Sequence, residues 1–188
     1  IAIGARFDDR VTGDVNTFAA GAKIIHFDID PTSISKNIKV DIPVVGDCRA
    51  ILKDCLAAIG KKKVTKRARK EWLSQISDWK AHHSLAYTQE DIIKPQYVVE
   101  KLYELTHGDC IVSTEVGQNQ MWAAQYFQFD RPRRWLTSGG LGTMGYGFPA
   151  ALGAQIAYPN KTVIDIAGDG SIQMNIQELA TATQYNLP

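Results

Sequence analysis

The sequence carries almost no net charge and has no long apolar run. Its 21 Lys and Arg residues against 20 Asp and Glu residues give a formal net charge of +1 at pH 7. The chain as a whole therefore has no general attraction to nucleic acid or to acidic lipid. No apolar run approaches the roughly 18 residues of a membrane-spanning helix, and the first residues lack the basic-then-apolar order of a secretory signal. We expect no nucleic-acid partner and no membrane insertion.

Cysteine is scarce too. The three cysteines, at positions 48, 55 and 110, form neither a CxxC pair nor an even set. This pattern argues against a disulfide framework and favours buried thiols in a reducing compartment, so the expected location is cytoplasmic. The four histidines show no metal-ligand spacing with these cysteines. The composition, 45% apolar and 22% charged, is that of an ordinary globular chain.

The most informative stretch covers residues 163–171 and reads VIDIAGDGS. Its apolar, β-branched residues predict a buried strand that ends at Gly168, Asp169 and Gly170. In an open parallel sheet, ligands bind beyond the carboxyl ends of the strands, where a turn with free N–H groups favours phosphate. A carboxylate beside a phosphate needs a bridging cation, and Mg²⁺ suits a lone Asp169 because it leaves most positions to phosphate oxygens and water. The competing interpretation is a tight turn whose Asp169 only caps the next helix, which we expect to start at Asn175.

Two more glycine-bearing turns precede that stretch. After a short buried strand predicted over residues 110–114, Gly117 allows the chain to turn before the head of a helix. Later, five glycines lie between Gly139 and Gly147, ahead of a slim alanine-rich helix. Because so many glycines carry a large entropic cost, we expect a ligand to approach this backbone closely. All three turns follow strands of one predicted sheet, so they could converge on one ligand.

Residues 1–60 read as the end of another α/β domain. A strand predicted over residues 23–30 places Asp28 near its carboxyl tip, where an acid can accept a hydrogen bond from a nucleotide ribose. The glycine fingerprint GxGxxG, which usually precedes such an acid, does not occur in the residues before Asp28. Asp47 follows a third strand, and the simplest interpretation makes it the cap of the helix that ends near Gly60.

These patterns predict an α/β fold with two domains. Residues 1–60 are assigned to the C-terminal part of a Rossmann-like middle domain, and residues 61–93 to a basic linker followed by a helix. Residues 94–188 are assigned to the N-terminal part of a doubly wound parallel-sheet domain. Both ends of the sequence interrupt an expected unit, so we expect an internal piece of a longer polypeptide.

Three runs together resemble the catalytic subunits of the acetolactate synthase (acetohydroxyacid synthase) family of thiamine diphosphate enzymes. They are EVGQNQMWAAQ at residues 115–125, GGLGTMGYGFPAA at 139–151 and GDGSIQMNIQEL at 168–179. The runs GARFDDRVTG at 4–13 and HFDIDP at 26–31 resemble the FAD-binding middle domain of the same family. The similarity covers essentially the whole chain.

The resemblance implies an enzyme that decarboxylates pyruvate and joins the two-carbon unit to a second 2-oxo acid, pyruvate or 2-oxobutanoate, in branched-chain amino acid biosynthesis. It also implies thiamine diphosphate, Mg²⁺ and FAD as cofactors, a homodimer or homotetramer, and a regulatory subunit as a possible partner. Carried over residue by residue, Asp169 would bind Mg²⁺, and the turn made by Gly168, Asp169, Gly170 and Ser171 would bind the diphosphate.

The remaining carried-over positions also concern cofactors. Gln118 and Asn119 would contact the diphosphate, although the family usually has His at position 119. Met144 would be the apolar wedge that bends thiamine diphosphate, and the carbonyl of Gly142 would accept a hydrogen bond from the cofactor's amine. Flavin-nucleotide contacts would fall on Asp28 and Asp47, with Arg10 near the flavin.

No residue of this chain is assigned a catalytic role. The glutamate that activates the cofactor ring belongs to the family's N-terminal domain, and the Asn of the second half of the thiamine diphosphate motif does not follow Asp169 within the sequence. We therefore expect the 188-residue chain alone to be inactive. Two alternatives remain open: another thiamine diphosphate enzyme, such as a pyruvate oxidase or a 2-oxo acid decarboxylase, and a non-catalytic nucleotide-binding module.

Overall fold

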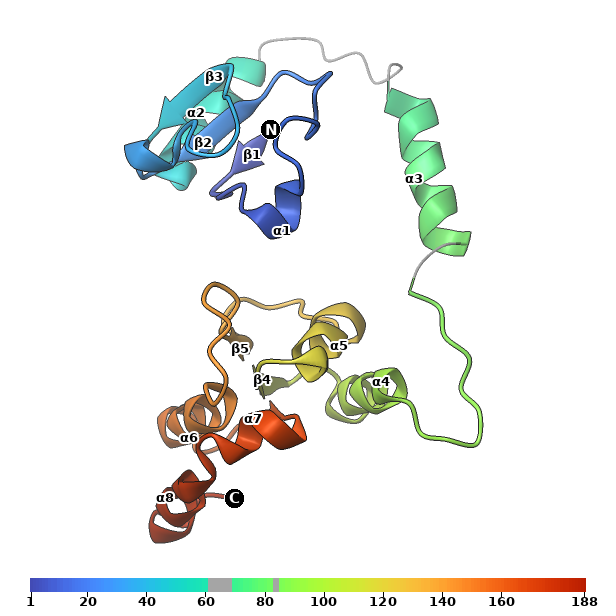
Figure 1. Cartoon of the computed structure of the whole chain (residues 1–188), viewed down its shortest axis with the longest axis vertical. Coiled ribbons are helices and arrows are strands. Elements are labelled where there is room, and N and C mark those ends of the chain that lie inside the picture. The colour runs from blue at the N-terminus through green and yellow to red at the C-terminus, as the bar shows by residue number, and fades with distance from the viewer. Residues whose placement is uncertain (61–68, 83–84) are drawn as a thin grey trace. The chain divides into compact units, whose positions relative to one another are not determined.

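The computed structural model describes residues 1–60, 69–82 and 85–188 (Figure 1). These residues form two compact units, 1–74 and 75–188, and three parallel strands form the sheet of each unit. The predicted α/β class with parallel sheets is confirmed. Most of the basic segment assigned to a linker, residues 61–68, lies outside the described residues. The helix expected after it is α3 (Lys70–His82), and the domain boundaries given above stay predictions.

The first unit contains a sheet in the order β1-β2-β3. Its strands are β1 (Ala2–Ile3), β2 (Ile25–Asp28) and β3 (Ile42–Val45), and its helices are α1 (Asp9–Thr12), the 3-10 helix η1 (Pro31–Ser33) and α2 (Cys48–Ile59). The central strand β2 buries His26 and Phe27, and the Phe7 ring packs edge-on against His26 with 5.1 Å between ring centroids. The two strands expected to end near Asp28 and Asp47, β2 and β3, are neighbours in this sheet.

The second unit contains a sheet in the order β5-β4-β6. Its strands are β4 (Cys110–Thr114), β5 (Trp135–Thr137) and β6 (Thr162–Ile166). Its helices are α4 (Pro95–Thr106), α5 (Gln118–Tyr126), α6 (Gly147–Ala157), α7 (Asp169–Gln173), the 3-10 helix η3 (Ile176–Glu178) and α8 (Leu179–Gln184). Among the described residues, no helix is both long and apolar enough to cross a bilayer.

Successive residues of the central strand β4 serve the two faces of the second sheet, because side chains alternate along a strand. Cys110 and Val112 join the apolar cluster under α4 and α5, which also contains Val99 and Phe127. On the other face, the Ser113 hydroxyl donates a hydrogen bond of 2.8 Å to the carbonyl of Gly147, where α6 begins. Figure 1 shows α5 and α6 on opposite sides of β4. Helices therefore cover both faces, as in a doubly wound fold.

The helix expected to start at Asn175 does start there, because Asn175 is the N-cap of η3 and η3 continues directly into α8. The short helix α7 precedes it and was not expected. Gly168 is the N-cap of α7, so Asp169 is already in the first helical turn. Asn175 precedes η3 without a side-chain capping bond, because its amide donates a hydrogen bond of 2.6 Å to the carbonyl of Gly145. The prediction of a helix start at Asn175 is therefore confirmed, although a distant backbone group takes the side-chain amide and no local side-chain cap forms.

Candidate functional site

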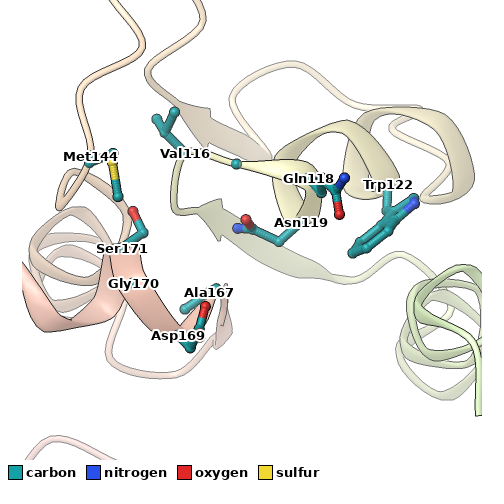
Figure 2. Close-up of a pocket in the computed structure, with 11 residues that line it drawn as sticks. Val116, Gln118, Asn119, Trp122, Met144, Ala167, Asp169, Gly170 and Ser171 are labelled. Carbon is teal, nitrogen blue, oxygen red and sulfur yellow. The ribbon is translucent and has the colours of Figure 1, made fainter.

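A cavity of about 380 Å³ opens at the carboxyl edge of the second sheet (Figure 2). Its lining comes from residues 116–119 and Trp122 after β4, from Met144 in the glycine-rich loop after β5, and from residues 167–171 after β6. The expectation that three turns converge is confirmed, since the parallel strands end at one edge of the sheet. Figure 2 shows Asn119 and Trp122 on one side of the cavity and Met144, Ser171 and Asp169 on the other.

Most of the residues carried over to a thiamine diphosphate site line this one cavity: Gln118, Asn119, Met144, Gly168, Asp169, Gly170 and Ser171. Gly142 is not among the lining residues; it adopts a φ of 66° beside Val116. The fold thus gathers seven predicted positions from three separate segments, and their roles toward a cofactor stay predictions.

The Asp169 carboxylate is exposed and makes no hydrogen bond or ion pair with any residue that the structure describes. The competing interpretation, in which this side chain caps the next helix, has no support in the geometry, because α7 has no side-chain capping bond. Within the described ranges, no group of three His, Cys, Asp or Glu side chains could hold a metal ion. Asp169 alone could bind a cation that takes its other ligands from elsewhere.

Asn119 links the ends of two strands. Its amide nitrogen donates hydrogen bonds of 3.0 Å to the carbonyl of Glu115 and 2.8 Å to the carbonyl of Ile166. Because both acceptors are carbonyl oxygens, the orientation of the amide is fixed, and its oxygen is directed toward Gly117 and Gly168. Asn119 therefore offers an acceptor to the cavity, while its two N–H donors are already used by the backbone.

Two glycines of the glycine-rich loop are required by packing within the protein. A Cβ on Gly147 would lie 2.5 Å from the backbone nitrogen of Glu115, and one on Gly145 would lie 2.7 Å from the Asn175 amide nitrogen. Gly145 also has a φ of 85°, which disfavours other residues. Long-range contacts of the fold already exclude a side chain at these two positions, and the expected approach of a ligand to this loop stays a prediction.

Glu115 is a site residue that the sequence analysis did not assign. Its side chain is fully buried, and its carboxylate accepts hydrogen bonds from the backbone N–H of Gly145 (2.9 Å), the backbone N–H of Phe148 (2.8 Å) and the Ser171 hydroxyl (2.8 Å). The available signal was its position directly after a buried strand, the same criterion that selected Asp169. The residues that it joins lie 30 to 56 positions away in the sequence, so periodicity could not reveal them.

Asp165 is a second acid with buried carboxylate oxygens that the sequence analysis left unassigned. It pairs with Ser113 across β6 and β4, and neither of its carboxylate oxygens has a hydrogen-bond partner among the described residues. Burial, with a smaller contribution from the charge of Glu115, raises the pKa of Asp165 to about 7. Two carboxyl groups therefore lie beneath the glycine-rich loop, one with three donors and one with none.

Comparison with known families identifies both units. Residues 115–188 match the model of the thiamine pyrophosphate enzyme C-terminal TPP-binding domain, and residues 1–55 match the thiamine pyrophosphate enzyme central domain. The chain belongs to the thiamine pyrophosphate enzymes. The cavity lies within the part that matches the TPP-binding domain of these enzymes.

Acetolactate synthase large subunits are similar to this chain over its whole length. The protein of Buchnera aphidicola subsp. Schizaphis graminum is 54% identical over 99% of the chain, and the isozyme 3 large subunit of Escherichia coli K12 is 52% identical over 100%. Acetolactate synthase 1, chloroplastic, of Nicotiana tabacum is 48% identical over 100%. The chain spans 33%, 33% and 28% of the length of these three relatives.

The other carried-over residues of this chain lie in the first unit. Asp28 is the last residue of β2, and Asp47 lies two residues after the end of the neighbouring parallel strand β3. The N–H of Gly46 donates a hydrogen bond of 2.9 Å to the carbonyl of Asp28. Asp47 accepts a hydrogen bond of 3.0 Å from the N–H of Ala50, which confirms its predicted capping of α2. Arg10 is exposed on the short helix α1. The structure brings the two acids to one sheet edge.

Proposed function

We propose that this chain is part of the catalytic subunit of an acetolactate synthase. That enzyme would decarboxylate pyruvate and join the two-carbon unit to a second molecule of pyruvate or to 2-oxobutanoate. The observation that carries the proposal is the 48–54% identity to acetolactate synthases over 99–100% of the chain, which includes both units. A pyruvate oxidase, a 2-oxo acid decarboxylase or a non-catalytic module is less well supported.

The cavity fits thiamine diphosphate with Mg²⁺. Asp169 has a free carboxylate for the metal, and the backbone N–H groups of Asp169, Gly170 and Ser171 have no acceptor among the described residues, so they can donate to phosphate oxygens. The side chain of Gln118 and the acceptor oxygen of Asn119 face the same space. When bound, thiamine diphosphate supplies the ring that stabilises a carbanion during decarboxylation.

The first unit would hold FAD. Asp28 and Asp47 lie at the carboxyl ends of adjacent parallel strands, which is where α/β sheets bind nucleotides. One Asp47 oxygen caps α2, and the other has no partner among the described residues. Arg10 is exposed, and its positively charged guanidinium could donate hydrogen bonds to a phosphate or to the ring of a flavin nucleotide.

The complete enzyme would need groups that this chain does not place in the cavity. Asp169 is the single acidic residue among those that line it, so we expect the other metal ligands and the ring-activating glutamate to come from other segments or from a partner subunit. We therefore propose a homodimer or homotetramer, with a possible regulatory subunit, and an inactive chain when it is isolated. The three free cysteines suit a reducing, cytoplasmic compartment.

The test uses the complete subunit that carries this chain, with and without the substitution Asp169→Asn. We expect Mg²⁺-dependent thiamine diphosphate binding, measured by calorimetry, and acetolactate formation from pyruvate, both lost in D169N. The matched control is D130N, because Asp130 is exposed in the same unit and outside the cavity. Release of acetaldehyde without acetolactate would indicate a decarboxylase instead of the proposed synthase, and release of acetyl phosphate would indicate an oxidase. Unchanged cofactor binding in D169N would contradict the proposed metal site.

A further inference from the structure

Glu115 joins three segments at one buried carboxylate. One oxygen accepts the N–H of Phe148, in the first turn of α6. The other accepts the N–H of Gly145 and the hydroxyl of Ser171, which itself lies 3.3 Å from the nitrogen of Gly145. The side chain has no exposed surface. The glycine-rich loop, the start of α6 and the turn after β6 thus share one anion.

Burying the Glu115 carboxylate is unfavourable in free energy unless hydrogen-bond donors of the protein replace the water molecules that it loses. Here two backbone N–H groups and one hydroxyl supply them, and bonds to a charged acceptor are stronger than neutral ones. Asn175 holds the same glycine from its other side, because its amide donates to the Gly145 carbonyl at 2.6 Å. The peptide units around Gly145 are therefore held on both sides.

Gly145 is the direct neighbour of Met144, and Ser171 lies two residues from Asp169. Glu115 consequently ties the loop that presents Met144 to the turn that presents Asp169, while its own side chain lies outside the lining of the cavity. A ligand that spans from Met144 to Asp169 requires the spacing of these two segments to be fixed before it binds, because ordering them at that moment would weaken binding.

We propose that Glu115 is a positioning residue of the cofactor site: its buried carboxylate sets the distance between the Met144 loop and the Asp169 turn. This inference rests on the proposed thiamine diphosphate function. Glu115 would touch neither cofactor nor substrate, and it would act through Gly145 and Ser171. Similar supporting residues around metal sites change affinity or activity by about 10- to 100-fold when they are substituted.

The test is the nearly isosteric substitution E115Q in the complete subunit. A glutamine places an NH₂ group against either the Gly145 or the Phe148 N–H, so one of these donors loses its acceptor. We expect faster amide hydrogen exchange at Gly145 or Phe148, a dissociation constant for thiamine diphosphate with Mg²⁺ raised about 10-fold or more, and a lower kcat at saturating cofactor. The KM for pyruvate should change less than kcat.

A milder variant and a matched control complete the design. S171A removes one of the three donors and should weaken cofactor binding less than E115Q, and the double variant should lose less than the sum because both act through one carboxylate. E104Q makes the same change on the exposed side of α4 and should leave binding unchanged. If the unsubstituted subunit binds no thiamine diphosphate, the proposed function itself fails. If it binds normally and E115Q matches it in affinity and kcat, the positioning role of Glu115 is wrong.

Discussion

The Asn119 amide donates a hydrogen bond of 2.8 Å to the carbonyl oxygen of Ile166, 47 residues away. With its second bond to the Glu115 carbonyl, it ties the carboxyl ends of the two neighbouring strands β4 and β6 below the cavity. We predict that N119D, which puts a carboxylate against two carbonyl oxygens, lowers the free energy of unfolding by about 1–3 kcal/mol. Urea unfolding curves measure this change.

The control for N119D is the same substitution at Asn160, which is exposed in the turn between α6 and β6. N160D should unfold like the unsubstituted protein, because exposed substitutions usually change stability by less than about 0.5 kcal/mol. Equal stability of N119D and N160D would show that the Asn119 amide contributes nothing to the junction of the strands.

Two glycines of α6 provide a second matched pair. A Cβ on Gly147 would lie 2.5 Å from the nitrogen of Glu115, 2.6 Å from the carbonyl carbon of Thr114 and 2.7 Å from an Asp165 oxygen. A Cβ on Gly153, six residues later in the same helix, would meet nothing within 4 Å. The two positions therefore share a helix and differ in the space beside them.

We predict opposite effects of the two Gly→Ala substitutions on stability. G147A should destabilise by about 1–3 kcal/mol or more, because the methyl group must displace backbone atoms of β4. G153A should stabilise by roughly 0.5–1 kcal/mol, because alanine loses less conformational entropy in a helix. Thermal or urea unfolding of both variants decides the matter, and a stabilised G147A would mean that α6 is not packed against β4 as described.

The buried Asp165 carboxyl predicts a pH dependence of stability. Burial raises its pKa to about 7 in the folded protein, from the ordinary value of 3.8 that it regains on unfolding. Between these two values the folded state holds a proton that the unfolded state has released, so stability must fall as pH rises through this window. Below about pH 4 both states are protonated, and Asp165 contributes no such dependence.

The substitution D165N removes the titrating carboxyl group, so this variant should not lose stability through Asp165 as the pH rises. We expect the free energy of unfolding of D165N, relative to the unsubstituted protein, to grow by roughly 1–3 kcal/mol between about pH 4 and about pH 7. Urea unfolding at several pH values measures the difference, with D130N as the exposed control. A difference that stays constant over this window, or shrinks as pH rises, would contradict the assignment.

Most of the strands, and the edge of the sheet that carries the site, could be predicted from the sequence. Apolar β-branched runs identified β2, β3, β4 and β6, and turn chemistry at their ends pointed to residues 117–119 and 168–171, which do line one cavity. These signals are local: a strand followed by glycine and a polar residue can be recognised within about ten residues of sequence. The parallel order of the strands then brings the turns together.

The interior of the site depends on contacts that no local pattern encodes. Glu115 is bonded to Ser171, 56 residues later, and Asn175 is bonded to Gly145, 30 residues earlier. A buried acid after a strand has the same local appearance as an exposed one, so Glu115 and Asp169 could not be told apart by spacing. The same limit applies to Gly147, because the atoms that exclude a side chain there belong to residues 114, 115 and 165, far away in the sequence.

Met144 combines partial exposure with a place in the cavity, so its substitution should affect activity more than folding. Its side chain is 46% exposed, and its terminal carbon lies 4.0 Å from where a Cβ on Gly170 would be. We predict that M144A in the complete subunit lowers kcat by about 10-fold or more, because an apolar contact that orients the cofactor is lost. The free energy of unfolding should change by less than about 1 kcal/mol.

Two further variants, M144L and M121A, test whether the volume and the position of the Met144 side chain matter for activity. M144L conserves volume and should keep most of the activity, since unbranched and branched side chains of equal size exchange with little cost. M121A is the control, because Met121 is 55% exposed on α5 but does not line the cavity. Acetolactate formation and urea unfolding of the three variants distinguish the outcomes. If M144A kept full kcat and lost several kcal/mol of stability, Met144 would be a packing residue, and the wedge role carried over from the family would have to be withdrawn.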